Sequence, residues 1–530
     1  MSVKGNKQAP TPYLDALVAL RDDRDPTRLM VPGHKAGLGV SPRLRDALGA
    51  NALEMLGLDI PLHMRGIDVA PPDPTPLQQS LTLAAEAWGA HRTYFVLGGG
   101  SQANHIICLA LAMLARGERP RVAVQRNVHQ SVIYGLMLAD AEVVWLEPEV
   151  DSDFGVEHGV SPLSLERTLE QEADANLDAV MVVSPTYHGA VSDVAGLAAT
   201  IGGMRKEGET LLVTDEAWGA HFAFDPERFP TTAVQAGADI VVSSTHKILG
   251  SLTQSAMLHI TRSVSPKIAR EVDHAIEKAR GLVKTTSPSS LLTASLDSAR
   301  AFACGDGAAL LRRAADQADR VRAAVASGRL PEIRAIDETV VQRNASVAGF
   351  DPLRVTLDVR DTGLTGREVR DALLDRKGRG VEIEFCTDQL VVLLFGIGDG
   401  SDNAGDRVID ALAALPPSAA ARHIAPIVAP QRPETLSSLR EGFLGKEQTR
   451  RLEDSAQWIC AEIVAPYPPG IVLVMPGELL LPVHVEYLRR VRDGGAHFAD
   501  CRDPSLKHIQ VLRGGGSLGV APRPVVQPRG

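Results

Sequence analysis

Between residues 93 and 243, short apolar runs alternate with helical segments. A strand that is apolar throughout is typical of a sheet covered on both faces, and parallel strands separated by helices need crossover connections. The pattern therefore predicts an α/β domain with a mostly parallel sheet and helices on both faces. The predicted strands are Thr93–Leu97, Val122–Gln125, Val143–Leu146, Ala179–Ser184, Leu211–Thr214 and Ile240–Ser243.

The pattern changes near Thr285–Ser289, where two smaller α+β regions begin to follow the large domain. We divide the chain into an N-terminal arm (1–50), a large domain (51–290), a small α+β domain (291–415), a C-terminal α+β domain (416–512) and a Gly-, Pro- and Arg-rich tail (513–530) that we expect to be disordered. The predicted helices are Tyr13–Asp22, Leu77–Trp88, Gln102–Arg116, Leu291–Ala326 with a break at Gly305–Gly307, and Leu480–Arg492. Further strands are predicted at Leu353–Val359, Val381–Phe385 and Leu390–Phe395.

Composition narrows the class of protein. Hydrophobic residues make up 44% and charged residues 23% of the chain, which is ordinary for a globular protein. The net charge of −10 offers no basic stripe for nucleic acid, and no apolar run is long enough to span a membrane. The N-terminus has no apolar signal region, so we expect a cytoplasmic protein. The five cysteines are scattered and never form a C-x-x-C pair, which argues against disulfides and against a metal site.

Polar side chains with reactive groups follow two of the predicted strands. Asp215 ends one strand, and Lys247 follows the next between apolar segments. Burial disfavours the ammonium form of a lysine, so such an amine can act as a nucleophile near neutral pH. A glycine-rich loop, Gly98–Ser101, precedes both. These groups are the ones that bind pyridoxal 5'-phosphate (PLP). PLP needs a lysine to bind its aldehyde, a carboxylate to hold its ring nitrogen and N–H groups to bind its phosphate.

Several motifs spread over the chain resemble those of the prokaryotic Orn/Lys/Arg decarboxylases. They are Pro32-Gly-His-Lys35, Ser184-Pro-Thr-Tyr187, Asp215-Glu-Ala-Trp218, Ser244-Thr-His-Lys247, Thr285-Thr-Ser-Pro-Ser289, and Pro466-Tyr-Pro-Pro-Gly470 with Pro476-Gly-Glu478. The resemblance covers about Tyr13 to Val511. It implies a fold-type I (aspartate aminotransferase-like) PLP enzyme with a mostly parallel seven-stranded sheet in its large domain. It also implies the short type, without an N-terminal wing domain, because Tyr13 already begins the arm, and the decamer of the larger members is not expected.

The resemblance assigns roles to individual residues. Lys247 is the imine-forming lysine, with His246 beside it at the phosphate and substrate side. We expect Lys247 or His246 to be the acid that protonates the carbanion left after CO₂ departs. Asp215 holds the ring nitrogen, His129 stacks on the ring and Trp218 packs beneath the same loop. The expected catalytic residues are Lys247, His246, Asp215 and His129, and the cofactor-binding set adds Gly100, Ser101, Gln102, Ser244 and Trp218. Two residues depart from the family pattern, since Gly100 lacks the usual hydroxyl and Gln130 replaces the usual lysine.

The implied reaction is the decarboxylation of arginine, lysine or ornithine to a polyamine-type amine and CO₂. Glu478 and Glu382 are candidates to meet the cationic side chain. A homodimer or dimer-based oligomer is expected, with residues near Ser289 or Glu478 serving the neighbouring site. The main alternative is an aminotransferase or other PLP lyase, in which Arg354 would hold the α-carboxylate. A serine acyl enzyme would need elements beyond Ser244-x-x-Lys247 that do not occur. A non-catalytic PLP-binding protein is disfavoured because Lys247, Asp215 and His129 are all present.

Overall fold

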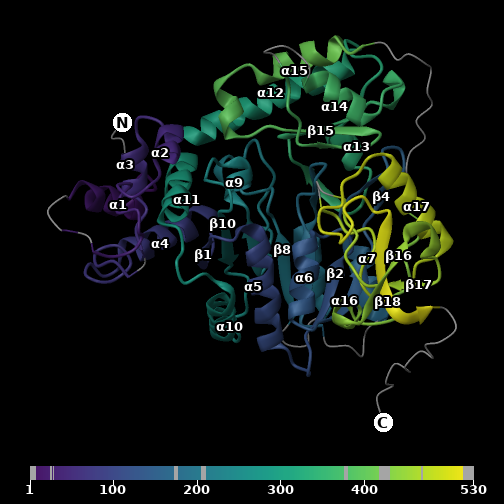
Figure 1. The fold of residues 1–530 in the computed structure, drawn as a ribbon, viewed down its shortest axis with the longest axis horizontal. Helices are drawn as coiled ribbons and strands as arrows, with labels where there is room; N and C mark the ends of the chain where they lie inside the picture. Colours follow the sequence, from purple (N-terminus) through teal and green to yellow (C-terminus); the bar gives the residue numbers. More distant parts are fainter. Residues whose placement is uncertain are drawn as a thin grey trace.

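The computed structural model describes residues 7–23, 27, 29–61, 63–171, 177–204, 210–374, 380–416, 430–466 and 470–516. The chain forms a central large domain with the small domain above it and the C-terminal domain to one side (Figure 1). The N-terminal arm lies at the opposite end from the C-terminal domain. Its region contains the helices α1 (Pro12–Asp22), α2 (Pro42–Leu48), α3 (Ala52–Gly57) and α4 (Pro76–Trp88).

The large domain is built on a seven-stranded sheet in the order β1-β10-β9-β8-β6-β2-β3. The five strands from β9 to β3 pair in parallel, whereas β10 is antiparallel to both of its neighbours. The fold predicted from the sequence is therefore confirmed. The strands are β1 (Arg92–Val96), β2 (Arg121–Gln125), β3 (Glu142–Leu146), β6 (Ala179–Val183), β8 (Leu211–Asp215), β9 (Ile240–Ser243) and β10 (Ala256–Ile260). The pattern did not predict β10, whose apolar run is interrupted by His259.

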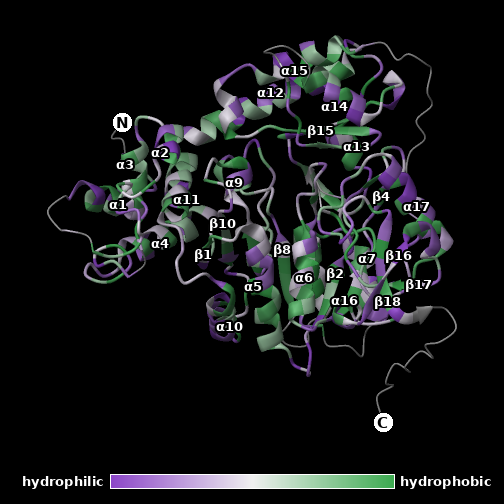
Figure 2. Cartoon of the chain, viewed as in Figure 1, coloured by the Kyte–Doolittle hydropathy of each residue, from purple (hydrophilic) through white to green (hydrophobic). Residues whose placement is uncertain are grey.

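Alternate side chains of these strands enter two different cores. On one face Val122, Val124 and Val242 pack against α5 (Gly99–Leu114), α6 (Gln130–Leu138) and α10 (Ala269–Val283). On the other face Ala123 and Val241 pack against α7 (Pro162–Gln171) and α8 (Val194–Met204). Because both faces are covered, the strands are apolar throughout and appear hydrophobic in Figure 2.

The small domain combines a four-stranded antiparallel sheet with long helices. α11 (Ser290–Phe302) and α12 (Ala308–Ala326) are separated by a π-type turn in which Gly305 leaves helical geometry, which confirms the predicted break. The sheet order is β11-β13-β15-β14, and β12 instead pairs with β7 of the large domain, which ties the two domains together. The elements are β7 (Ala190–Ser192), β11 (Arg334–Ile336), α13 (Glu338–Val341), β12 (Val347–Phe350), β13 (Arg354–Asp358), α14 (Gly366–Leu374), β14 (Phe385–Cys386), β15 (Leu390–Leu394) and α15 (Ala404–Ala413).

The C-terminal domain is a three-stranded sheet with two helices. Its sheet order is β16-β18-β17, and its elements are α16 (Leu439–Leu444), β16 (Glu447–Arg451), β17 (Trp458–Cys460), α17 (Pro482–Asp493) and β18 (His508–Gly516). A small hairpin of the large domain, β4 (Val150–Asp151) and β5 (Val156–Glu157), lies on the same side of the molecule (Figure 1).

Two predicted boundaries were wrong. The strand expected at Val381–Phe385 is reduced to Phe385–Cys386, because only these two residues pair with β15. The tail expected to be disordered from residue 513 is ordered through Gly516, because β18 continues between β16 and β17. The remainder of that tail lies outside the described residues.

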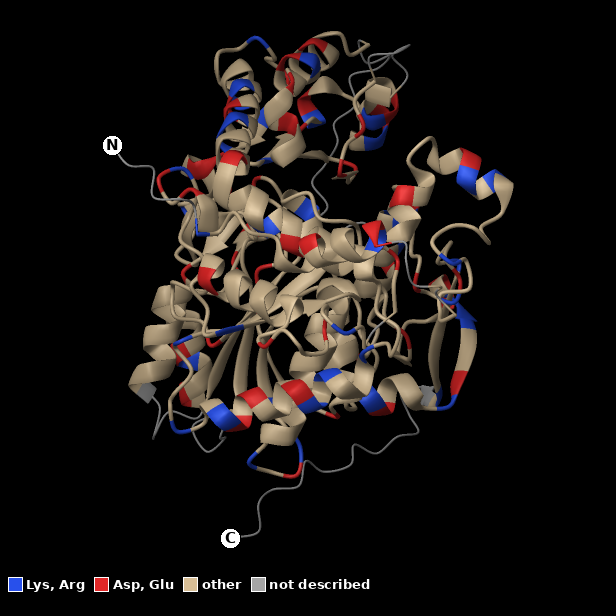
Figure 3. Cartoon of the chain, turned by 90° about the vertical axis from the view of Figure 1, so that its left-hand side faces the viewer, with Lys and Arg blue, Asp and Glu red and all other residues tan. Residues whose placement is uncertain are grey.

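The surface is mixed in charge. Figure 3 shows acidic and basic residues interspersed along the outward-facing helices, whereas the central strands carry few of either. Among the described residues, no helix combines the length and the apolarity that crossing a membrane would require.

Candidate active site

The carboxyl ends of two adjacent strands bring the two predicted key residues together. Asp215 is the last residue of β8 and pairs with Val242 of β9. Lys247 lies in α9 (Thr245–Ile248), a short helical turn that begins just after β9. The crevice at this edge of a parallel sheet is where open α/β folds bind ligands.

Lys247 has an amine that loses its proton more readily than a free lysine does. Burial lowers its pKa from 10.5 to about 8, opposed by the charge of Asp215 and assisted by Arg354. The Nζ atom lies 3.8 Å from the centroid of the Trp218 ring, so the indole covers one approach to the amine. A substantial fraction of this amine is therefore neutral and nucleophilic near physiological pH.

Asp215 is buried and held in a fixed orientation. Its Oδ2 accepts a hydrogen bond from Asn104 Nδ2 at 2.9 Å, and its Oδ1 accepts the backbone N–H of Ala217 at 3.0 Å. Asn104 comes from α5 and also donates to Ser131 Oγ at 3.0 Å. A carboxylate restrained in this way can hold one protonated ring nitrogen in place.

His129 caps the start of α6 and is linked to the same network. Its Nδ1 accepts the backbone N–H of Ser131 at 3.2 Å, which leaves the proton of the neutral ring on Nε2. Burial, assisted by the nearby Lys247, lowers the pKa of His129 to about 4. A neutral imidazole at this position is suited to stack on an aromatic cofactor.

The glycine loop forms the first turn of α5 rather than a separate loop. A Cβ added at Gly100 would lie 2.7 Å from Ser244 Oγ, so the Ser244 hydroxyl occupies the space beside this turn. Ser244 is buried, and its hydroxyl has no hydrogen-bond partner among the residues that the structure describes. An unpaired hydroxyl and the N–H groups of a helix start suit a phosphate. The residues thus fit PLP.

Three other residues were predicted to bind the cofactor, and the structure shows their surroundings. Ser101 is exposed in the first turn of α5. Gln102 points its Nε2 to the carbonyl of Val283 at 2.9 Å, and so joins α5 to α10. His246 donates its Nδ1 proton to the carbonyl of Ser255 at 2.7 Å, which fixes the ring at the edge of the site.

Arg354 brings a second cation to the site from the small domain. Its guanidinium carbon lies 3.9 Å from the centroid of the Trp218 ring, the ring that Lys247 also contacts. Arg354 is fully buried with Asp351 at 3.5 Å, and its Nε and Nη2 atoms have no hydrogen-bond partner within the described part of the chain. The group could bind an anion.

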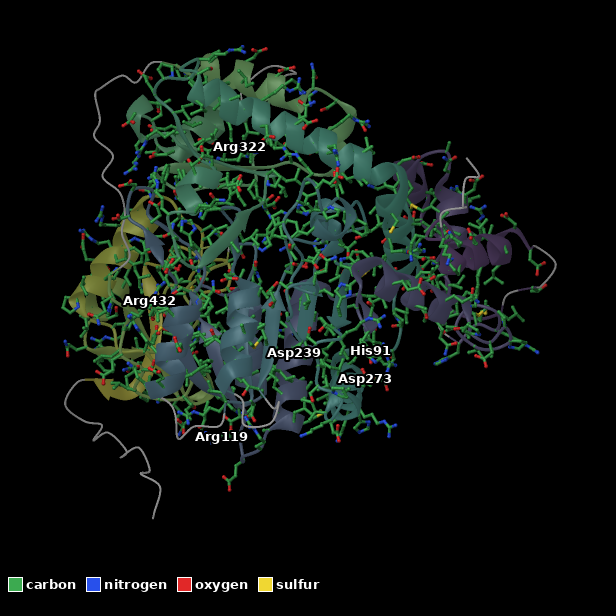
Figure 4. All side chains as sticks on the ribbon, turned by 180° about the vertical axis from the view of Figure 1, so that it is seen from behind. His91, Arg119, Asp239, Asp273, Arg322 and Arg432 are labelled. Carbon is green, nitrogen blue, oxygen red and sulfur yellow. The ribbon has the colours of Figure 1, made fainter. Side chains whose placement is uncertain are left out.

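A cavity of about 880 Å³ lies where the three domains meet. Tyr187 and Phe385 form part of its wall and pack in the same apolar cluster as Trp218, so the cavity adjoins the lysine site. Glu384 also lines it, and the Glu384 charge favours the protonated form of Lys247. Figure 4 shows Arg432 on the C-terminal side, where it pairs with Glu157 in the cavity wall.

The two acidic residues expected to meet a substrate cation lie elsewhere. Glu478 is buried and pairs with Arg126 at 2.9 Å, which already uses its charge. Glu382 is exposed and does not line the cavity. The substrate roles expected for Glu478 and Glu382 stay predictions. The acid of this region that lines the cavity beside Lys247 is Glu384.

Gln130, one of the two departures from the family pattern, contacts the C-terminal domain. Its backbone N–H donates to the carbonyl of Gly470 at 3.2 Å, and its Nε2 donates to Asp500 at 2.6 Å. His129 beside it forms a β-bridge with Ile471. The C-terminal domain therefore closes over the start of α6. Residues 467–469 of the Pro466–Gly470 motif lie outside the described residues.

Asn104 and Glu384 are the residues of this site that sequence reasoning missed. Asn104 lies on a helix one turn after the glycine loop, at a spacing that faces the same direction as Gly100, which was a usable signal. Glu384 comes from another domain, and its approach to Lys247 depends on domain packing that no local pattern reveals.

The sheet order and the strand-end lysine and aspartate define a fold-type I PLP-dependent enzyme. The family model described as "Orn/Lys/Arg decarboxylase, major domain" matches residues 11–403, and the model of the C-terminal domain of the same family matches residues 438–499. The chain belongs to the Orn/Lys/Arg decarboxylase family and is a PLP-dependent decarboxylase.

Individual relatives and a solved structure are similar to this chain. The arginine decarboxylase of Bacillus subtilis (strain 168) is 29% identical over 494 residues, 92% of this chain and 95% of that protein. The lysine decarboxylase LdcA of Pseudomonas aeruginosa is 25% identical and aligns with 84% of this chain and 71% of its own length. The solved structure of lysine decarboxylase A from Pseudomonas aeruginosa superposes with a TM-score of 0.76 at 20% identity, covering 96% of this chain and 81% of that chain.

Proposed function

We propose that this enzyme decarboxylates a basic L-amino acid, arginine, lysine or ornithine, to the corresponding polyamine-type amine and CO₂. The observation that carries the proposal is Glu384, a carboxylate in the wall of the cavity beside Lys247. A long substrate whose α-carbon lies at Lys247 would extend its side chain into this cavity. A cationic end there would meet a negative charge.

The other acids in the cavity wall each lie within 4.0 Å of an arginine, although two of them share the single cation Arg432. Glu147 and Glu157 pair with Arg432, and Asp388 lies 3.5 Å from Arg367. Glu384 forms no ion pair with any residue that the structure describes. Lys247 and Arg354 are cations on which the Glu384 charge acts at longer range. A partly buried carboxylate that no ion pair within 4.0 Å neutralises favours a cationic ligand.

We assign the catalytic roles as follows. Bound PLP supplies an electron-withdrawing ring to which the electrons of a bond at the substrate α-carbon can pass. Lys247 holds the cofactor covalently, and Asp215 keeps the ring nitrogen protonated. His129 covers one face of the ring. Lys247 or His246 returns the proton to the α-carbon, and a pKa of about 8 allows Lys247 to do so near neutral pH.

The nearest alternative is an aminotransferase, and one observation favours it. Arg354, which lies 3.5 Å from Asp351, has two donors without a hydrogen-bond partner among the described residues, and such a group can bind an α-carboxylate. An aminotransferase would turn over only with a keto-acid acceptor and would release no CO₂. Carbon dioxide release without an added keto acid therefore separates the two reactions.

The test is CO₂ release across a matched set of amino acids. Arginine, lysine and ornithine should be turned over, whereas citrulline and norleucine, which are close in size but uncharged, should not. Arginine is the first to test, because several relatives that align with most of this chain are named arginine decarboxylases. Lys247→Ala should release no CO₂ from any of them.

Glu384→Gln provides the matched variant for the cation site. It should raise KM for the preferred cationic substrate by roughly tenfold to a hundredfold, because a hydrogen bond to a charged group is worth about 1.5–3 kcal/mol. The kcat should change less. Turnover of norleucine at the rate of lysine, or an unchanged KM in Glu384→Gln, would contradict the assignment.

We further propose a homodimer. Apolar side chains lie exposed around the N-terminal arm, among them Leu29 at 90% and Leu38 at 80% exposure, and a second copy of the chain would cover them. By resemblance, residues near Ser289 would then face the neighbouring site.

We also propose a reducing, cytoplasmic location, supported by five cysteines that are all free thiols.

A further inference from the structure

A buried histidine of the large domain contacts a buried carboxylate of the small domain. His221 lies at the start of the short helical turn Phe222–Phe224 that follows β8, and Asp351 lies between β12 and β13. The Nε2 atom of His221 is 3.1 Å from Oδ1 of Asp351, and neither side chain is exposed. The contact therefore joins the two domains in the protein interior.

The Asp351 carboxylate is ionised and accepts a hydrogen bond from His221. Burial raises the pKa of Asp351, but the charge and hydrogen bond of His221, together with the charge of Arg354, lower this pKa below its ordinary value. An ionised carboxylate has no proton to give, so the Nε2–H of His221 is the donor. Oδ1 of Asp351 also accepts the backbone N–H of Leu353 at 3.0 Å, and the backbone N–H of Asp351 donates to the carbonyl of Gly189 at 2.8 Å. The carboxylate is thus held from both domains.

Asp351 is the counter-ion of Arg354. Its Oδ2 atom lies 3.5 Å from Nε of Arg354, which is an ion-pair distance rather than that of a close hydrogen bond. The guanidinium carbon lies 3.9 Å from the centroid of the Trp218 ring, and Nζ of Lys247 lies 3.8 Å from the same centroid. Arg354 therefore contacts the indole that Lys247 contacts, and its charge acts on the amine.

We infer that His221 and Asp351 are positioning residues for Arg354. They hold its guanidinium against the Trp218 ring, where its charge reaches the amine of Lys247. The inference rests on the role proposed for Lys247 and adds to it. Because His221 takes one side of the Asp351 carboxylate, the carboxylate balances the guanidinium charge without drawing it into a close pair away from the indole. The histidine of the large domain thereby couples the position of the small domain to the reactive amine.

The test measures the amine of Lys247 in the full chain without cofactor. An amine-reactive reagent labels the neutral amine, and mass spectrometry of the peptide follows the labelling rate over a range of pH. His221→Leu removes the donor to Asp351. The carboxylate then draws the Arg354 guanidinium from the indole, so the midpoint should rise by roughly half a pH unit or more. His221→Gln keeps an N–H donor, and its midpoint should stay close to that of wild type.

A double-mutant cycle separates positioning from a general loosening of the interior. Burial is the largest of the causes that lower the pKa of Lys247, so a variant that merely admits water raises the midpoint. Such an effect would add to that of Arg354→Met. Positioning acts through the guanidinium, so His221→Leu should cause no further shift in the Arg354→Met background.

Asp351→Asn should shift the midpoint in the opposite direction. It removes the counter-ion and leaves the full charge of Arg354 beside the indole, which favours the neutral amine, so the midpoint should fall. His259→Leu is the matched control, because His259 is also completely buried but stacks on Trp88 at a centroid distance of 5.3 Å. It should leave the midpoint unchanged. Thermal melting shows which variants are folded, and the isosteric Asp351→Asn keeps the test valid if His221→Leu does not fold.

Three results would overturn the inference: an unchanged midpoint in folded His221→Leu, an equal shift by this substitution with and without Arg354→Met, or a raised midpoint in Asp351→Asn. The other titratable groups that act on Lys247 or respond to it stay in place in every variant, namely Asp215, Glu384, His129 and His246.

Labelling uses neither cofactor nor substrate, so the inference and the proposed function fail separately. A protein that shows this coupling yet releases no CO₂ from basic amino acids would refute the proposed substrate and leave the inference standing. CO₂ release from those amino acids without the coupling would refute the inference alone.

Discussion

At the scale of single residues, the site depends on the proton affinity of Lys247. Burial and the positive charge of Arg354 favour the neutral amine, whereas Asp215 and Glu384 favour the ammonium form. Burial is the largest of these influences, and the balance puts the pKa at about 8. The amine is thus partly neutral at the pH of a cell, and Arg354 is the cation that the structure places to tune it.

Replacing Arg354 by methionine should raise the pKa of Lys247. A positive neighbour disfavours the ammonium form, so its removal favours that form and shifts half-titration to higher pH. The measurement is the pH dependence of the rate at which an amine-reactive reagent labels Lys247 in the apo-protein, read by mass spectrometry of its peptide. The wild-type rate should rise through a midpoint near pH 8.

Arg354→Lys keeps the charge and is the control for this experiment. Its midpoint should stay close to that of wild type. A midpoint that does not move in Arg354→Met, in a variant that still melts cooperatively, would show that Arg354 does not act on the amine.

Sequence reasoning located some residues of this site and not others. Asp215 and Lys247 follow predicted apolar strands, and parallel neighbours end at one edge, so their proximity could be anticipated. Glu384 could not, because its position depends on how the small domain packs on the large one. The pairing of Glu478 with Arg126 could not be anticipated either, because it spans 352 positions in sequence.

At the scale of elements, the C-terminal domain is fixed to the large domain by a buried ion pair. Arg126, at the end of β2, donates to Glu478 at 2.9 Å and to the carbonyl of Val472 at 3.0 Å. Glu478 also accepts the backbone N–H of Met475 at 2.7 Å. Both side chains are almost completely buried, so loss of one leaves the other charged group without compensation.

Glu478→Ala should therefore lower the free energy of unfolding by about 3–5 kcal/mol. Chemical denaturation of the full chain measures this change. Glu486→Ala removes an exposed acid that pairs with Arg489 in α17, and it should cost no more than about 1 kcal/mol. A stable Glu478→Ala variant with a raised KM would instead support the substrate role expected for Glu478.

The elements themselves were predictable to different degrees. The parallel strands are apolar throughout because helices cover both faces of the sheet, and their positions agree closely with the pattern. The strand predicted at Val381–Phe385 begins too early. Exposed Glu382 and half-buried Glu384 alternate with apolar residues, as in a strand, but only the end of this segment pairs with β15. Such alternation gives a strand-like pattern without a partner strand.

At the scale of the whole molecule, the site is assembled from all three domains. The large domain supplies Lys247, Asp215 and His129, the small domain supplies Arg354 and Glu384, and the C-terminal domain closes over α6 through Gly470, Ile471 and Asp500. No domain alone encloses the cavity. The division into domains stays a prediction from changes in pattern. The contacts between the three regions could not be anticipated, because they join residues far apart in sequence.

The most direct test of this account is to find where the cofactor is attached. The purified enzyme is loaded with PLP, treated with borohydride to fix the covalent link, digested and analysed by mass spectrometry. The predicted result is a single modified peptide with the pyridoxyl group on Lys247, and none in Lys247→Ala. Attachment to a different lysine, or no attachment in a folded protein supplied with PLP, would contradict it.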